Sequence, residues 1–181
     1  KDQREPRTAL ADAAVLSALE PGGFDVRLAR HADIEHRWTF DLYLCGRSAS
    51  LTAVLPMIQS LGVEVLDEQP LAVTRPDGID CWIYEFTLQP AGGIAVSADV
   101  ADDLGHRFTD AFSHLWSGIA EVDEFNELVI RTRLDWRSIV MLRAYANYLR
   151  QCGFAYSTRR IASVLGDHAQ LAEALIDVVE A

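Results

Sequence analysis

The feature that most constrains this sequence is where strand-like patterns occur and where they stop. Apolar and polar side chains alternate over residues 24–29, 38–44 and 81–88, and 63–73 is a further strand-like run. Such alternation is typical of half-buried β-strands. The turn Arg75-Pro76-Asp77-Gly78 predicts a hairpin between the last two strands. After Gly118 only helical spacing remains, so we expect an α+β region followed by an all-α segment.

Helices are expected between and after these strands. Their apolar spacing and their end signals place them at residues 9–19, 51–61, 97–115, 136–152, 158–165 and beyond 167. Small polar residues precede several of them, and the expected N-caps are Ser48 or Ser50, Ser97, Asp135 and Asp167. Gly62 and Gly153 are expected at left-handed C-terminal positions.

The charge of the chain is unevenly distributed. The formal net charge of -11 argues against a nucleic-acid surface over the whole molecule and against adhesion to anionic lipid. Residues 131–160 nevertheless hold seven arginines and one acid, a net of +6, so the remainder carries -17. Lys1 is the only lysine, which excludes Schiff-base lysine chemistry within this chain.

The sequence contains no motif for catalysis or for a cofactor. No two glycines are spaced Gly-x-Gly, so a dinucleotide fingerprint and a phosphate loop are both absent. His106 and His114 share a helix face without a third ligand, and we expect no metal site. Asp67 and Glu68 could form an acid/base pair but are expected to be solvated carboxylates.

The cysteines Cys45, Cys81 and Cys152 show no paired spacing. Reduced thiols and a cytoplasmic location are therefore expected. No apolar run approaches the roughly 20 residues that a membrane span requires.

The loop from Gly46 through Arg47, Ser48 and Ala49 to Ser50 is the candidate effector-binding site. Glycine permits a close backbone approach, a helix N-terminus attracts anions, and an arginine can bind a carboxylate with two hydrogen bonds. The alternative is an ordinary capped connection between a strand and a helix.

The arginine-rich helix over 136–152 is the candidate interface. Arg143 and Arg150 share a face from which Arg137 is offset by about 120°. Trp136 and Tyr148 lie nearby, and aromatic residues and arginine are favoured at interfaces. These five residues are expected to contact an acidic domain or a phosphate-bearing ligand, the alternative being a solvated helix face.

Four longer sequence segments resemble those of a known protein family. They are VLPMIQSLGVEVLDEQP (residues 54–70), WIYEF (82–86), DAFSHLWSGIAEVDEFNELVI (110–130) and LDWRSIVMLRAYANYLRQCGFAYS (134–157). The order strand, helix, strand, strand, helix resembles an ACT domain, a small regulatory fold that commonly binds amino acids. Together the four segments resemble the large bacterial NAD-specific glutamate dehydrogenases, in the stretch that joins their last ACT-like domain to the catalytic domain.

This resemblance implies a specific organisation and function. The expected fold is an ACT-like, ferredoxin-like antiparallel sheet with helices on one face, followed by helices. Residues 1–36 would form an N-terminal arm, 37–120 the ACT-like domain and 121–181 a helical linker towards a catalytic domain outside this chain. The catalytic lysine, the nucleotide-binding glycines and NAD would belong to that domain, which converts L-glutamate to 2-oxoglutarate and ammonia. The chain itself is expected to be an excised, non-catalytic segment.

Its expected partners are the rest of the parent chain, other subunits of a homo-oligomer and an amino-acid effector, with no nucleic acid and no membrane. Pairing of an exposed strand edge with a second copy is plausible, because such an edge is otherwise a liability. A structural docking scaffold without a small-molecule site is the alternative function.

Overall fold

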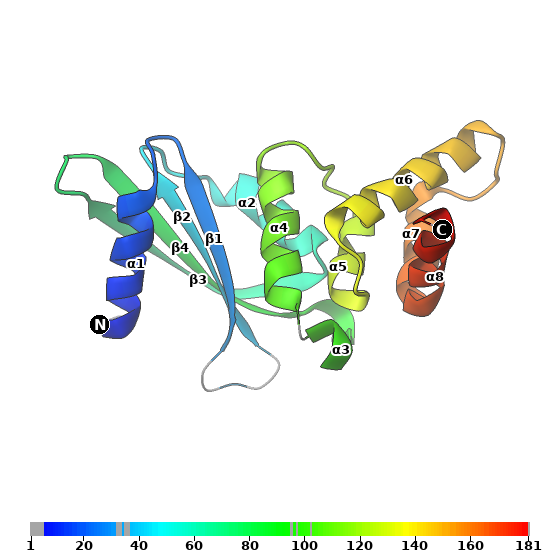
Figure 1. Ribbon diagram of the computed structural model, residues 1–181, viewed down its shortest axis with the longest axis horizontal. Coiled ribbons are helices and arrows are strands. Elements are labelled where there is room, and N and C mark those ends of the chain that lie inside the picture. Colours follow the sequence, from blue (N-terminus) through cyan, green and yellow to red (C-terminus); the bar gives the residue numbers. More distant parts are fainter. Residues whose placement is uncertain are drawn as a thin grey trace.

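A four-stranded antiparallel sheet with helices on both faces is followed by a helical segment (Figure 1). The computed structural model describes residues 6–31, 34, 37–94, 96, 98–101 and 103–180. Within these residues the strands are β1 (Phe24–Arg30), β2 (Trp38–Cys45), β3 (Val63–Thr74) and β4 (Asp80–Pro90). The helices are α1 (Pro6–Ala18), α2 (Leu51–Ser60), α3 (Ala98–Ala101), α4 (Leu104–Trp116), α5 (Leu128–Arg131), α6 (Trp136–Gln151), α7 (Thr158–Asp167) and α8 (Ala169–Glu180), with short 3-10 turns at Ala91–Gly93 (η1) and Glu124–Glu127 (η2).

The predicted α+β fold class is confirmed, and so is the strand, helix, strand, strand, helix order. The strand order in the sheet is β1-β2-β4-β3, with every neighbouring pair antiparallel. β1 pairs with β2 along its whole length, from Phe24 opposite Leu44 to Arg30 opposite Trp38. The N-terminal strand is thus one edge of the same sheet, and β3 is the other edge. The domain boundaries stay a prediction.

The main hydrophobic core lies between the sheet and the helices α2 and α4. Alternate residues of β2, such as Phe40 and Leu42, point into it because successive side chains of a strand face opposite sides. The Phe40 ring lies edge-on to Phe112 of α4, with 4.8 Å between the ring centroids. The same core continues into the helical segment through Phe125 of η2, Leu142 of α6 and Leu165 of α7. The sheet and the helical segment therefore share one core.

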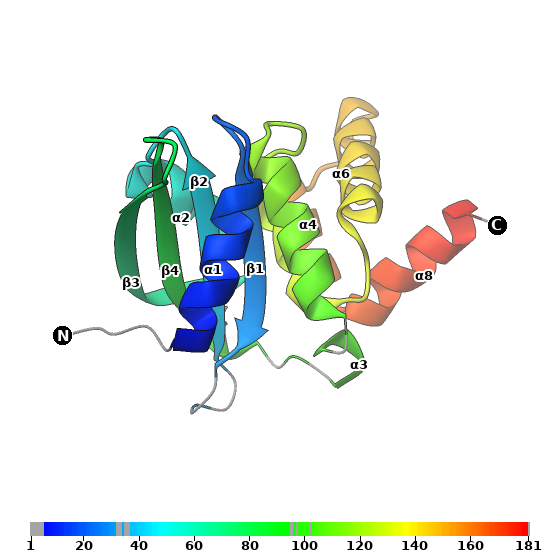
Figure 2. The ribbon, with the colours of Figure 1, turned by 60° about the vertical axis from the view of Figure 1, so that its left-hand side comes forward.

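The opposite face of the sheet is covered in part by α1 (Figure 2). Leu16 of this helix packs on Tyr43 and Cys45 of β2 and on Cys81 and Ile83 of β4. In Figure 1, α1 lies on one side of the sheet and α2 and α4 lie on the other. The expectation of helices on one face alone is therefore wrong, because the N-terminal helix packs on the second face.

Two details of the expected helices are wrong. The helix expected over 97–115 is divided into α3 and α4, which are separated at Asp103; the expected cap Ser97 lies outside the described residues. Asp167 does not cap the last helix, because it is the final residue of α7 and His168 follows it before α8 begins. Asp135 caps α6 as expected, and its carboxylate accepts from the backbone N–H of Ser138 at 2.9 Å.

Arg107 of α4 joins the sheet-covering helices to the helical segment. It is only 7% exposed. Its Nη1 donates to the backbone carbonyls of Val129 and Thr132, and its Nη2 donates to that of Val100, all at 2.7 Å. Burial lowers the pKa of this guanidinium from its ordinary value. A single side chain thus ties α3 and the end of α5 to α4.

Candidate functional site

The loop between β2 and α2 is fixed at its first residue, Gly46. Its φ of +77° is left-handed, a conformation that glycine adopts without strain. Its N–H donates to the carbonyl of Asp80 in β4 at 2.9 Å. A Cβ built on Gly46 would lie 3.4 Å from the backbone nitrogen of Gly22, so the turn before β1 also packs against this point. The sequence pattern located this turn correctly.

The far end of the loop is held by Tyr84 of β4. Its hydroxyl lies 3.2 Å from both the backbone nitrogen and the carbonyl oxygen of Ala49, and it accepts from one and donates to the other. Ser50 takes the N-cap position of α2, but its hydroxyl bonds to that of Thr52 at 2.6 Å and makes no cap bond. Side-chain capping by Ser50 is therefore wrong. Among the described residues, no group accepts from the backbone N–H of Leu51 or Thr52, so the start of α2 keeps donors free.

Arg47 is exposed, and its guanidinium lies over the ring of Trp116, 5.9 Å from the ring centroid. In the described part of the chain it forms no hydrogen bond and no ion pair with another residue. Ser48 is also exposed. The loop thus presents a free cation and hydroxyl groups beside an open helix N-terminus, an arrangement suited to a carboxylate.

Trp116, the last residue of α4, is the part of this candidate site that the sequence did not reveal. Its ring stacks on Phe112 at 6.1 Å and lies 6.0 Å from Phe24 of β1. Its indole N–H is buried without a hydrogen-bond partner among the described groups. Nothing in the local sequence links it to Arg47, since only the packing of α4 on the sheet brings the two together.

Arg143, one of the five interface candidates, is a buried structural residue instead. It is 5% exposed, and its Nη2 donates to Asp123 at 2.8 Å and to the Asn126 side chain at 2.9 Å. Its guanidinium also lies over the ring of Phe125, 5.7 Å from the centroid. Placing Arg143 on an exposed face is therefore wrong, because helical spacing alone does not show that η2 packs against that position.

Trp136 also turns partly inward. It stacks on His114 of α4, with 3.7 Å between the ring centroids, and Arg137 covers it at 4.9 Å. Its indole N–H is buried without a described partner. Arg137, Tyr148 and Arg150 remain exposed on α6.

Much of the positive charge of residues 131–160 is neutralised by flanking acids. Arg131 pairs with Glu127, Arg133 with Glu173, Arg143 with Asp123 and Arg159 with Glu124. Among the described groups, Arg137, Arg150 and Arg160 form no ion pair with an acidic side chain, although the charge of Arg137 helps to lower the pKa of the nearby Asp135 carboxyl. A shallow groove of about 560 Å³ runs between α6 and α8, lined by Met141, Ala144, Tyr145, Tyr148 and Val179.

The remaining candidates do not form sites. His106 is exposed, while the Nδ1 atom of His114 lies 2.7 Å from the carbonyl oxygen of Asp110. No group of three or more His, Cys, Asp or Glu side chains gathers in a metal-binding arrangement within the described ranges. Asp67 and Glu68 are neighbours on β3, so their side chains leave opposite faces of the sheet.

No helix among the described residues has the length and apolar character needed to cross a membrane.

Comparison with protein families gives two matches that together cover most of the chain. Residues 23–102 match the family model described as glutamate dehydrogenase, ACT3 domain. Residues 120–181 match the model described as glutamate dehydrogenase, helical motif 3.

Three curated proteins named NAD-specific glutamate dehydrogenase are similar to this chain. The one from Mycobacterium tuberculosis is 43% identical over 178 residues, 97% of this chain and 11% of its own length. The one from Halomonas elongata is 34% identical over 96% of this chain and 11% of its own length. The one from Pseudomonas aeruginosa is 37% identical over 75% of this chain and 8% of its own length. The chain spans about a tenth of the length of these relatives.

Proposed function

The chain belongs to the glutamate dehydrogenase family, of which it carries the ACT3 domain and helical motif 3, and we propose that it is a non-catalytic segment that regulates or assembles a longer NAD-specific glutamate dehydrogenase. The longer protein would oxidise L-glutamate with NAD to 2-oxoglutarate, ammonia and NADH.

The residues of this chain do not fit NAD. Dinucleotides bind at the carboxyl ends of parallel strands over a Gly-x-Gly-x-x-Gly turn, whereas this sheet is antiparallel and the sequence has no Gly-x-Gly. We therefore expect no NADH absorbance when the 181-residue chain is mixed with glutamate and NAD. Measurable turnover by the chain alone would contradict a non-catalytic role.

The regulatory part of the proposal rests on Arg47. Its exposed guanidinium has no described acidic partner, and Arg47 stands four residues before α2, whose first backbone N–H groups have no described acceptor. An amino-acid carboxylate could accept from both, while the Trp116 ring offers an apolar wall beside the guanidinium. Binding there would bias the position of α4 and, through Arg107, of the helices that follow.

Titration calorimetry of the chain with each common amino acid, at millimolar concentration, tests this site. We expect heat from at least one of them and a loss of at least tenfold in affinity in Arg47→Ala. Arg150→Ala is the matched control, because it removes an exposed arginine that lies on α6. No heat from any amino acid, or equal loss in both variants, would contradict an effector site at this loop.

The exposed part of α6 supports a docking scaffold as a second candidate. Arg137 and Arg150 are exposed and form no described ion pair, and Tyr145 and Tyr148, which line the groove, are 49% and 62% exposed. The remainder of the chain carries -17, so an acidic surface of a second copy would be electrostatically complementary. Edge strand β3, with Leu66, Leu71 and Val73 exposed, offers a further contact for strand addition.

Light scattering distinguishes this candidate from a monomeric sensor. A docking scaffold should show a dimer mass at low salt that falls at high salt, because the Debye length shortens from about 30 Å at 0.01 M to about 3 Å at 1 M. The double variant Arg137→Ala/Arg150→Ala should remain monomeric at both. A monomer mass for the unmodified chain under all conditions would contradict docking between copies.

A further inference from the structure

Cys45 and Cys81, which are 36 residues apart in the sequence, lie directly opposite each other on β2 and β4. The next pair of opposed residues along these strands, Gly46 and Asp80, is hydrogen-bonded, since the N–H of Gly46 donates to the carbonyl of Asp80 at 2.9 Å. Cys45 itself directs its N–H and carbonyl to the turn before β1: its N–H donates to the carbonyl of Gly23, and its carbonyl accepts from the N–H of Gly22. The cysteines therefore occupy a non-hydrogen-bonded position, where opposed Cα atoms are about 4.5 Å apart. This spacing lies within the range of disulfide-bonded residues.

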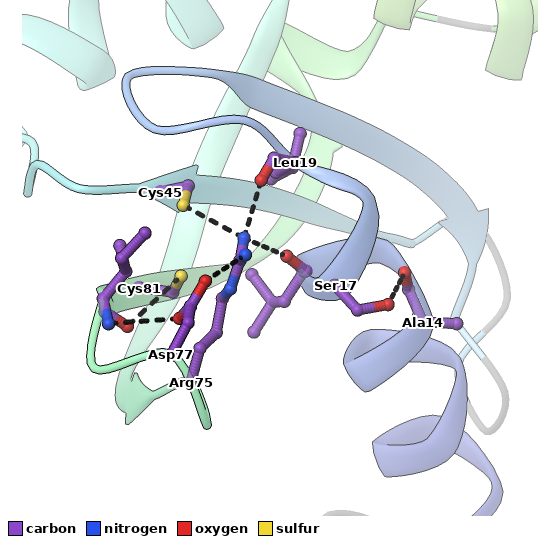
Figure 3. A network of polar contacts seen from close by, with 9 residues as sticks. Ala14, Ser17, Leu19, Cys45, Arg75, Asp77 and Cys81 are labelled. Atoms are coloured by element: carbon purple, nitrogen blue, oxygen red, sulfur yellow. Dashed lines mark hydrogen bonds and ion pairs between the residues drawn. The ribbon is translucent and has the colours of Figure 1, made fainter.

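The two side chains leave the same face of the sheet and are covered by α1 (Figure 3). Both are free thiols with 0% exposure, whereas Cys152 is exposed and lies in the helical segment. Burial raises the pKa of the Cys81 thiol, and its hydrogen bond with Cys45 raises it further. Both sulfur atoms thus lie on the buried face of the sheet beneath α1.

Arg75 connects this thiol pair to α1. Its Nη1 lies 3.5 Å from the sulfur of Cys45 and donates to the carbonyls of Leu16 and Leu19, at 3.1 Å and 2.6 Å (Figure 3). The guanidinium is also paired with Asp77, so it is held in place beside the Cys45 sulfur. The same guanidinium satisfies carbonyls at the C-terminal end of α1.

α1 buries few side chains for a helix that covers thiols, although Arg75 and Tyr43 hydrogen-bond to it. Of its described side chains only Asp12 and Leu16 are fully buried, and Leu10 is 78% exposed. A groove of about 300 Å³ lies between this helix and the β3–β4 turn, lined in part by Leu16, Val73 and Arg75. Elements with few buried contacts open locally at low free-energy cost, so small molecules can reach the face beneath them.

We propose that Cys45 and Cys81 form a redox modification site that hydrogen peroxide closes to a disulfide when α1 opens. The Cys45 thiolate attacks one peroxide oxygen, the O–O bond breaks, and the released hydroxide takes a proton to become water. The Cys81 sulfur then attacks the resulting sulfenic acid, the S–O bond breaks, and a second water leaves with the thiol proton. Two thiols are oxidised and one peroxide is reduced to two waters. The strands are already paired, so the fold is retained.

The test uses the folded chain with Cys152→Ser, which removes the one exposed thiol. After peroxide treatment, free thiols are blocked with iodoacetamide, and a non-reducing digest is read by mass spectrometry. We expect a Cys45–Cys81 linked peptide that a dithiol reductant removes. Recovery of Cys45 and Cys81 as blocked thiols, under conditions that oxidise Cys152 in the unmodified chain, would overturn the proposal.

A second variant tests the route through α1. Tyr43→Phe removes the hydroxyl that donates to Asp12 of α1 at 2.7 Å, while the cysteines remain in place. The rate of disulfide formation should rise about fivefold, because one hydrogen bond fewer holds the helix closed. An unchanged rate would overturn the opening of α1 as the step that admits peroxide.

Discussion

Replacement of Arg107 by methionine should strongly destabilise the chain. Methionine preserves much of the length and apolar packing of the side chain but removes all three hydrogen bonds to the carbonyls of Val100, Val129 and Thr132. In the described part of the chain, no other donor reaches the carbonyls of Val129 and Thr132. Because the site is only 7% exposed in total, water cannot easily replace the guanidinium.

The expected loss follows from these contacts. A buried polar group left without a partner costs about 1–3 kcal/mol, and three carbonyls lose their donor here. Releasing the guanidinium from a dry site returns part of this, since burial already lowers its pKa. We expect a net loss of about 3–5 kcal/mol in the free energy of unfolding. The acceptors are neutral carbonyls, so the loss should change little between low and high salt.

Urea unfolding followed by circular dichroism measures this loss. With a slope of roughly 2 kcal/mol per molar urea, the midpoint should fall by about 1.5–2.5 M. Arg137→Met is the matched control on the exposed surface of α6 and should cost less than about 1 kcal/mol, since it loses only an exposed contact over the Trp136 ring. A loss below about 1 kcal/mol in Arg107→Met would refute the assignment of the three carbonyl bonds as a main connection between α4 and the helical segment.

Three further changes test other parts of the structure. Gly62→Ala should cost about 2–4 kcal/mol in thermal unfolding, because φ at Gly62 is +85° and a Cβ would lie 2.8 Å from the side chain of Ile130. The control Gly78→Ala has a similar φ of +83° but open space around the Cβ, and it should cost about 1 kcal/mol. Asp135→Ala should cost about 1 kcal/mol in urea unfolding, because it removes the cap of α6. Burial alone would raise the pKa of the Asp135 carboxyl, but the hydrogen bonds from Ser138 outweigh burial and hold the pKa below 3.8. The stabilising contribution of this carboxylate is therefore present above pH 3.8 and is lost as the pH falls through the lowered pKa. Asp135→Asn should reduce this acid sensitivity in pH-dependent unfolding curves.

The sequence located the elements well where local signals were strong. Alternating side chains placed β2 and β4, and Gly62 and Asp135 marked helix ends correctly. The apolar–polar pattern and the capping residues act over a few positions, so they can be identified without knowing which elements pack against each other. Local signals failed where a helix breaks without proline or glycine, as between α3 and α4, and at Asp167, where a capping residue type ends one helix instead of starting another.

The candidate effector loop was found from its own residues, but its surroundings were not. Gly46 and Arg47 stand next to each other in the sequence, so their joint role in a turn could be read directly. Trp116 reaches Arg47 only because α4 packs on the sheet. Arg143 shows the converse, since a charged residue at helical spacing was expected on the surface and tertiary packing placed it over Phe125 and against Asp123.

By itself, the sequence determined an α+β region followed by helices, and the resemblance of its longer segments determined the family and the antiparallel sheet. Periodicity and turn residues act within a few positions of each other, so one chain carries enough information to define them. Strand order, the side of the sheet that α1 covers and the partner of each charge depend on contacts across tens of residues. For this reason only the tertiary structure decided that Cys45 faces Cys81, although both had been visible in the sequence as unrelated thiols.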